Sequence, residues 1–301
     1  MLDPQQLYTV HEQARAHLGD STPVMLHLLE GYVDAGQVSH QVSEHLLDTL
    51  DHELLAEFDH DQLHDYRSRR PPMVFDTNTW VSLTDFSLAL HRVTDSSGAD
   101  FLLLTGPEPD TQWNRATAAI LGLADELKVT QIITAQGVPM GVPHTRPILV
   151  TEHATNPEVV QDNPVWIDRV TVPGSFTGMV EYGAGKQGLL GRGLVAHVPH
   201  YLAPGTYIPA AITVLERIQN LTGLTLPTGG LASQAQSTMA QLADEVAGDG
   251  ELGPLVSQLE QQYDDMQANG RMFVPSADEI GAAAEQFLID RGDHEDPDAD
   301  D

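Results

Sequence analysis

The stretch that decides the fold is VMLHLLEGYVDAG, residues 24–36. Its first six residues form a short apolar run that predicts a buried strand, and this run ends at Glu30. A helix is predicted over Asp34–Leu50, because apolar residues then recur at three- and four-residue spacing. The apolar positions of this helix are Val38, Val42, Leu46, Leu47 and Leu50. A buried strand that passes through a short loop into a helix is the building unit of an α/β fold.

The same alternation of short apolar runs and amphipathic stretches continues along the chain. Further strands are predicted at residues 54–58, 101–105, 131–135, 148–151 and 193–198. Further helices are predicted at residues 113–127, 175–190 and 208–221. This alternation predicts a largely parallel sheet that is covered on both faces. The polar stretch 59–70 interrupts it and leads into apolar segments at 73–75 and 80–83, which predict a loop or hairpin excursion.

The pattern of apolar residues changes after residue 225. Helical spacing returns at residues 231–246, 252–269 and 278–290, without strand-like runs between them. The sequence therefore predicts an α/β domain over 1–225, a small all-α subdomain over 226–290 and an acidic, disordered tail over 291–301.

Composition excludes several classes of protein. The chain of 301 residues has 14 Lys and Arg against 44 Asp and Glu, a formal charge of −30. A surface this acidic repels phosphate backbones and anionic lipid, so neither nucleic acid nor a membrane is expected as the main partner. The absence of cysteine removes thiolate chemistry and Cys-type metal sites. Because no secretion-like N-terminus or long apolar run occurs, we expect a cytoplasmic protein.

Three segments resemble known motifs without the context that those motifs need. GAGKQG, residues 183–188, has the glycine pattern of a dinucleotide-binding loop, but it follows a predicted helix rather than a strand. GSFTG, residues 174–178, places its serine one position too early for a nucleophile elbow, so Ser175 is expected to begin a helix. His60 and His64 lie among aspartates, where a solvated acidic loop is favoured over a weak divalent-ion site. No catalytic set, cofactor or metal site is predicted.

The remaining candidate site follows from position in the fold. In open α/β sheets ligands bind beyond the carboxyl ends of the strands, so the loops after the apolar runs are where chemistry is expected. The candidate ligand or partner residues in these loops are Glu30, Tyr32, Asp34, Gly36, Glu108, His144 and Arg146. In this interpretation Arg146 holds an anion and His144 acts as an acid or a base. In the alternative, Asp34 caps a helix, the glycines and prolines build turns, and Arg146 pairs with Glu30 or Glu108.

The same loops carry a family resemblance. GYVDAG (31–36), YRSRRP (66–71), GPEPDTQW (106–113), GVPHTRP (141–147) and PGSFTG (173–178) follow one another in this order. As a set they resemble the proteasome assembly chaperone 2 family, and specifically its actinobacterial branch, over residues 20–225. The resemblance implies a three-layer α/β/α domain similar to purine nucleoside phosphorylases and related hydrolases. It also implies a homo-oligomer, a trimer by analogy with bacterial relatives.

The resemblance also sets the expected function. In the eukaryotic branch the family is non-catalytic and escorts proteasome α-subunits into a ring, so proteasome subunits are an expected partner here. Such chaperones commonly dock a C-terminal tail ending hydrophobic–Tyr–any residue, whereas this sequence ends DADD, so contact through the folded surface is expected. We therefore expect a non-enzymatic, oligomeric, protein-binding protein. The alternative is a small-molecule binder or enzyme of the hydrolase or phosphorylase type that uses the strand-end loops.

Overall fold

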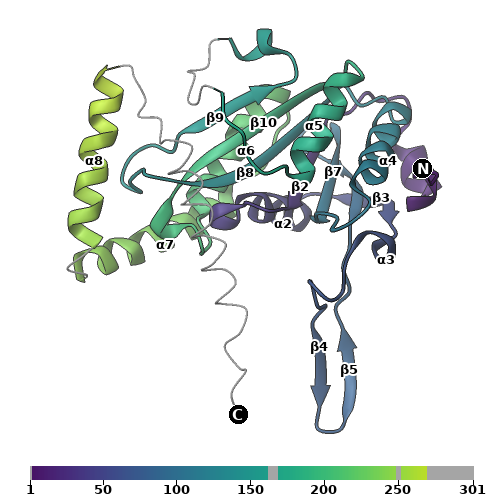
Figure 1. Ribbon diagram of the computed structural model, residues 1–301, viewed down its shortest axis with the longest axis horizontal. Coiled ribbons are helices and arrows are strands. Elements are labelled where there is room, and N and C mark those ends of the chain that lie inside the picture. Colours follow the sequence, from purple (N-terminus) through teal and green to yellow (C-terminus); the bar gives the residue numbers. More distant parts are fainter. Residues whose placement is uncertain (1, 162–168, 249–251, 270–301) are drawn as a thin grey trace. The chain divides into compact units, whose positions relative to one another are not determined.

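The computed structural model of the chain describes residues 2–161, 169–248 and 252–269 (Figure 1). Its strands are β1 (Tyr8–Val10), β2 (Met25–Glu30), β3 (His52–Phe58), β4 (Met73–Asp76), β5 (Thr79–Leu83), β6 (Ala89–Thr94), β7 (Asp100–Pro107), β8 (Gln131–Met140), β9 (Val150–Ala154) and β10 (Leu190–Pro199). Its α-helices are α1 (Glu12–Leu18), α2 (Val38–Thr49), α3 (His60–Leu63), α4 (Trp113–Glu126), α5 (Phe176–Lys186), α6 (Ile208–Thr222), α7 (Gly229–Gly248) and α8 (Leu252–Asn269). Short 3-10 helices are η1 (Pro4–Leu7), η2 (Ala35–Gln37), η3 (Pro157–Val160) and η4 (His200–Leu202). Among the described helices, none combines the length and the apolar character that crossing a membrane requires.

The strands form a large mixed sheet in the order β1-β3-β6-β7-β2-β8-β10-β9, and β4 pairs with β5 separately. β2 runs parallel to both β7 and β8, and all of its residues from Met25 to Leu29 are buried. Burial on both faces is typical of a parallel strand with helices above and below it. The predicted fold class, an α/β sheet flanked by helices with a helical C-terminal part, is confirmed.

The prediction of a largely parallel sheet is wrong for one side of the sheet. There β1, β3, β6 and β7 pair antiparallel. The sequence prediction lacks β6 altogether. Residues 95–99 alone join β6 to β7, and such a short connection allows only an antiparallel pair, since a parallel crossover needs a dozen residues or more.

The chain divides into two compact units. The first comprises residues 1–32, 50–134 and 174–192, and the second comprises 33–49, 135–173 and 193–301. Strands β8 and β10 begin in the first unit and end in the second. The proposed division into 1–225 and 226–290 stays a prediction, and the predicted helix at 278–290 and the acidic tail at 291–301 lie outside the described residues.

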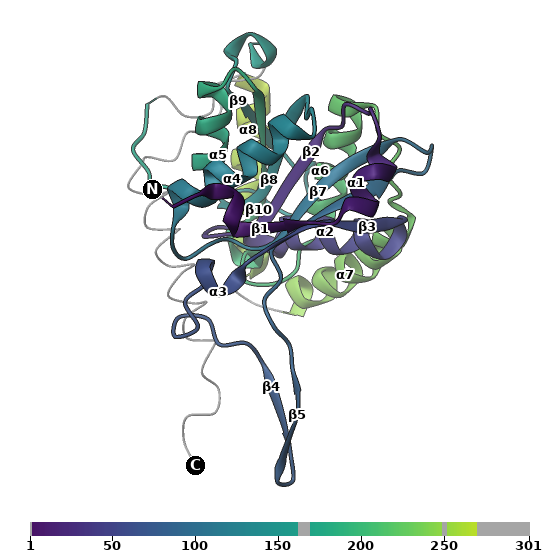
Figure 2. The ribbon, with the colours of Figure 1, turned by 90° about the vertical axis from the view of Figure 1, so that its right-hand side faces the viewer.

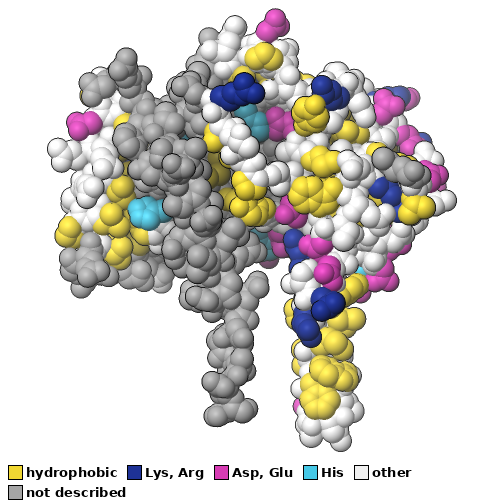
Figure 3. All heavy atoms as spheres, viewed as in Figure 1, with side chains coloured by type: hydrophobic (Ala, Val, Ile, Leu, Met, Phe, Trp, Pro, Cys, Tyr) yellow, Lys and Arg dark blue, Asp and Glu magenta, His cyan; other side chains and the backbone are white. Residues whose placement is uncertain are grey.

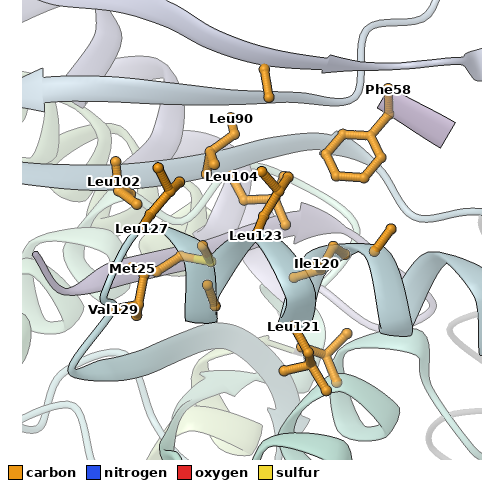
Figure 4. Packing of buried hydrophobic residues seen from close by; sticks show 14 of the residues in the cluster. Met25, Phe58, Leu90, Leu102, Leu104, Ile120, Leu121, Leu123, Leu127 and Val129 are labelled. Carbon is orange, nitrogen blue, oxygen red and sulfur yellow. The ribbon is translucent and has the colours of Figure 1, made fainter. Parts of the chain in front are cut away.

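Each unit has its own buried apolar residues. In the first unit, side chains of the sheet pack against α4 and α5, and Figure 4 shows Met25 and Leu104 of the strands close to Leu123 and Leu127 of the α4 segment. In the second unit α2 packs against α6, and α6 packs against α7. The helices and strands therefore hold the loops at the strand ends on packed scaffolds.

Candidate functional site

Glu108 follows strand β7 and ties together three segments of the first unit. Its side chain is buried, and its carboxylate accepts the backbone N–H of Phe176, at the start of α5, at 3.4 Å. Its own N–H donates to the carbonyl of Glu30 at 3.0 Å. Burial raises the pKa of Glu108, and the N–H groups of Phe176 and Tyr32 and the charge of Arg69 oppose that rise. Three of the predicted site residues, Glu30, Tyr32 and Glu108, therefore meet at this strand end.

The same loop anchors the chain segment that leads into β4. The ring Nε2 of His64 lies 3.3 Å from the carbonyl of Pro107. The backbone N–H of Asp65 donates to Asp110 Oδ2 at 2.8 Å, and Arg69 Nε lies 3.0 Å from Asp110 Oδ1. We call residues 64–72 the stem, and these contacts fix the stem to the loop after β7.

Beyond the stem, β4 and β5 form a two-stranded ribbon, residues 73–83, that extends away from the sheet of its unit (Figures 1 and 2). Its large apolar side chains are each 49–63% exposed. They are Met73, Val74, Phe75, Trp80, Val81 and Leu83. Figure 3 shows hydrophobic side chains along the ribbon and Lys or Arg side chains at the end nearest the body of the unit. An isolated two-stranded hairpin is at best marginally stable in water, so this surface is suited to contact with another molecule.

The sequence predicts a loop or hairpin excursion at this place but assigns no function to it. The available signal is the pattern of the two strands, MVF at 73–75 and WV at 80–81, which place apolar residues at consecutive positions. Because successive side chains of a strand point to opposite faces, such a pattern makes both faces apolar. The same pattern occurs in strands that are buried on both faces, so the sequence cannot distinguish a buried strand from an exposed one. The structure shows that nothing in the described part of the chain covers these side chains.

Asp34, in the second unit, is a helix cap. Its carboxylate accepts the N–H groups of Ser39 at 3.0 Å and of Gly137 at 3.0 Å, and that of His40 at 3.4 Å. Burial raises the pKa of Asp34, and these hydrogen bonds oppose the rise. Next to it, Gly36 has a φ of 69°, a conformation that favours glycine. The capping alternative is thus the role that the structure gives Asp34.

His144 forms a pair with Tyr201 of η4. The Tyr201 hydroxyl accepts the backbone N–H of His144 at 3.0 Å and lies 2.7 Å from the ring Nδ1. Because the hydroxyl oxygen accepts the N–H, its proton can be donated to Nδ1, which leaves the ring neutral with its proton on Nε2. Burial lowers the pKa of His144, which favours this neutral form, and the charge of Glu260 acts in the opposite direction. Tyr201 was not predicted as a site residue, and no sequence pattern links it to His144.

Arg146 is held by the C-terminal helix α8. Its Nε and Nη2 lie 2.8 and 2.7 Å from the carboxylate of Asp264, and its Nη1 lies 3.0 Å from Glu260. In the same contact the Tyr263 hydroxyl donates to the carbonyl of Pro147 at 3.0 Å. The partners that the structure gives Arg146 are therefore Asp264 and Glu260, not the Glu30 or Glu108 of the alternative interpretation. Residues more than 110 positions away supply its partners, a separation over which sequence spacing predicts nothing.

The glycine-rich motif and Ser175 have structural roles. Gly183 lies inside α5, where a Cβ atom would come 2.8 Å from Leu121 Cδ1 of α4, so it permits a close approach of two helices. The Ser175 hydroxyl accepts the N–H of Gly178 at 3.0 Å and begins α5 as predicted. The helix ends before residue 190, the predicted limit, since Gly188 adopts a φ of 78°.

Comparison with known proteins gives the family. The PAC2 family model matches residues 28–246, which include the strand-end loops, the ribbon and the start of the helical part. The chain belongs to the PAC2 family. The resemblance seen in the five loop motifs is thereby confirmed. A search of curated proteins gives no match.

Several solved structures are similar to most of the chain. A Mycobacterium tuberculosis protein of unknown function is 39% identical with a TM-score of 0.85, and the match covers 92% of this chain and 96% of that one. A Corynebacterium glutamicum protein of unknown function is 36% identical with a TM-score of 0.84, covering 88% of this chain and 100% of that one. A Mycobacterium tuberculosis proteasome-assembly chaperone homologue is 23% identical with a TM-score of 0.71, and the match covers 77% of this chain and 99% of that one. At this identity, the last likeness shows a shared fold alone.

Proposed function

We propose that this PAC2 protein is a non-enzymatic, cytoplasmic homo-oligomer that binds other proteins in the manner of an assembly chaperone. The observation that carries the self-association is the ribbon, whose six large apolar side chains are about half exposed. The name of the Mycobacterium tuberculosis relative, a proteasome-assembly chaperone homologue, supports the choice of proteasome subunits as the protein partner.

The area of the ribbon fits self-association. A half-exposed large side chain presents roughly 100 Å², so the six side chains together present roughly 600 Å². A stable interface buries about 800 Å² on each partner. The ribbon therefore supplies most of one partner's share, and the stem beside it supplies the rest.

Sedimentation velocity over a range of protein concentrations tests self-association. The double variant Phe75→Ser, Trp80→Ser removes the two aromatic side chains of the ribbon, whose rings lie 4.9 Å apart. The matched control is Val172→Ser, Tyr182→Ser, two apolar residues that are as exposed but lie outside the ribbon. We expect the unaltered protein and the control to form the same oligomer and the ribbon variant to dissociate. A wild-type protein that stays monomeric at every concentration tested would contradict the proposal.

The choice of partner needs a separate experiment. Purified proteasome α-subunits from the same organism are mixed with the oligomer, and complexes are separated by size-exclusion chromatography. Co-elution, or a change in the rate at which α-subunits assemble into rings, supports the chaperone role. If neither occurs, the proteasome part of the proposal is wrong, while self-association is unaffected.

One observation favours a second function, a small-molecule enzyme, and that observation is the Tyr201–His144 pair. A neutral imidazole held by a tyrosine hydroxyl is able to act as a general acid or base. Asp34 is occupied as a cap, and Arg146 is occupied by α8, so neither is available to a ligand in this arrangement. Turnover of ester or nucleoside substrates that is lost in both His144→Gln and Tyr201→Phe would establish the enzyme. Unchanged turnover in these variants would show that the pair is not catalytic, and no turnover in the wild type would remove the second function.

A further inference from the structure

The stem contains a turn that is fixed from both sides. The Asp65 side chain accepts the N–H of Arg67 at 2.9 Å, and the Asp65 carbonyl accepts the Ser68 hydroxyl at 3.0 Å and the N–H of Arg69 at 2.9 Å. Asp65 itself is anchored, because its N–H donates to Asp110 at 2.8 Å. The backbone of residues 65–69 is therefore ordered before any partner binds, which lowers the entropy cost of recognition.

The three arginines of the stem have different surroundings. Arg69 is partly buried and paired with Asp110, so it serves the anchor. Arg67 and Arg70 are exposed, and within residues 2–161, 169–248 and 252–269 no carboxylate forms an ion pair with either of them. In a chain with 44 acidic residues against 14 basic ones, these two arginines, three positions apart, are available to carboxylates of another molecule.

The charge of the chain indicates which molecule that is. Two copies that each carry −30 repel one another, so a stable contact between them needs apolar area together with local positive charge. Residues 66–83 combine both, since they contain three arginines, one aspartate and the exposed apolar side chains of the ribbon. The rest of a second copy is rich in carboxylates, which are the natural partners of the guanidinium group.

We propose that Arg67 and Arg70 form a carboxylate-recognition site at the base of the ribbon, and that they pair with acidic side chains of a second copy of this chain. The inference rests on the proposed self-association and adds to it the residues that overcome the repulsion between two acidic copies. The stem that carries these arginines also adds interface area to that of the ribbon. Charge complementarity of this kind raises association rates and determines which partner is accepted.

The test measures the dissociation constant of the oligomer at low and high salt, roughly 0.05 and 0.5 M NaCl, where screening lengths differ about threefold. The variant is Arg67→Glu, Arg70→Glu. The matched control is Arg217→Glu, an exposed arginine of α6 that also lacks an ion pair among the described residues. A third variant, Arg67→Lys, Arg70→Lys, keeps the charge but removes the planar donor group.

Salt screens both the repulsion between the acidic copies and the attraction of the arginines for carboxylates, so it should act on the wild-type oligomer and the Arg217→Glu control alike. The charge-reversal variant should bind itself at least about tenfold more weakly at low salt, with that deficit shrinking at high salt. The lysine variant should keep the salt dependence but bind itself more weakly than the wild type, because it loses the planar donor group. Circular dichroism identifies a variant that has failed to fold, and in that case an unchanged dissociation constant of the folded lysine variant would contradict the proposal.

Two results would overturn parts of the reasoning separately. If the charge-reversal variant assembles as tightly as the wild type, the arginine pair has no part in the interface, although the proposed oligomer stands. If the wild type is monomeric but binds another acidic protein through Arg67 and Arg70, the second copy is the wrong occupant, and the proposed self-association fails with it.

Discussion

Replacing the buried His27 of β2 with leucine should remove part of the acid sensitivity of the protein. His27 is 1% exposed, its ring lies 6.3 Å from that of Phe176, and neither ring nitrogen has a hydrogen-bond partner among the described residues. Burial lowers the pKa of His27 to about 4. The unfolded chain, with a pKa of about 6.5, therefore binds one proton more than the folded protein between these two values.

The size of the effect follows from this difference. Stability falls as the pH falls below about 6.5, by about 1.4 kcal/mol for each pH unit, and the loss levels off below about pH 4. At pH 5 the buried His27 therefore lowers the free energy of unfolding by about 2 kcal/mol. Leucine is close to histidine in volume and needs no hydrogen bond, so His27→Leu should match or exceed the wild type at neutral pH.

Urea unfolding followed by tryptophan fluorescence, repeated between about pH 5 and pH 7.5, measures the effect. The difference in unfolding free energy between His27→Leu and the wild type should grow by about 2 kcal/mol toward pH 5. His91 and His197, whose pKa values are also lowered by burial, are present in both proteins and cancel in the comparison. His11→Gln, at an exposed position, is the control. Parallel stability curves for the wild type and His27→Leu would refute the reasoning.

Three further predictions concern the candidate site and the elements around it. Asp34→Ala leaves three N–H groups without their acceptor and should lower the free energy of unfolding by about 1–3 kcal/mol, measured by chemical denaturation. Gly137→Ala places a Cβ against the Ala35 carbonyl oxygen and should lower the free energy of unfolding by about 3 kcal/mol or more. Gly122→Ala in α4 has open space around it and should raise the free energy of unfolding by about 0.5–1 kcal/mol. Thermal unfolding of the two variants measures both changes. Arg146→Ala should speed amide hydrogen exchange selectively in α8, which loses its ion pairs to Arg146. The increase should be at most about tenfold, because these ion pairs are partly exposed to solvent. Equal exchange rates in the variant and the wild type would show that Arg146 does not hold α8.

Local sequence patterns predict much of the fold because they report local physics. The apolar run at 24–29 becomes β2, and the periodic stretch at 208–221 becomes α6. The spacing of apolar residues indicates whether one face or both faces of a strand or helix are buried. Ser175 is recognisable as a helix start for the same reason, because its hydrogen bond reaches only three residues along the chain. The five loop motifs, taken in order, were enough to indicate the family.

The candidate site was predicted less well, because its contacts join distant parts of the chain. Glu108, Glu30 and Tyr32 meet through backbone groups at the end of β7, as position in the sheet predicts. The role of Arg146 depends on Glu260 and Asp264, whose spacing on α8 marks them only as surface acids.

The sequence by itself determined the α/β class, most of the strands and helices, the excess of negative charge and the family. Only the tertiary structure decided that β6 and β7 pair antiparallel, that the described part of the chain leaves the ribbon uncovered and that no described carboxylate forms an ion pair with Arg67 or Arg70. The reason is that periodicity records whether a residue favours burial, whereas pairing and exposure depend on which distant segment comes to lie beside it.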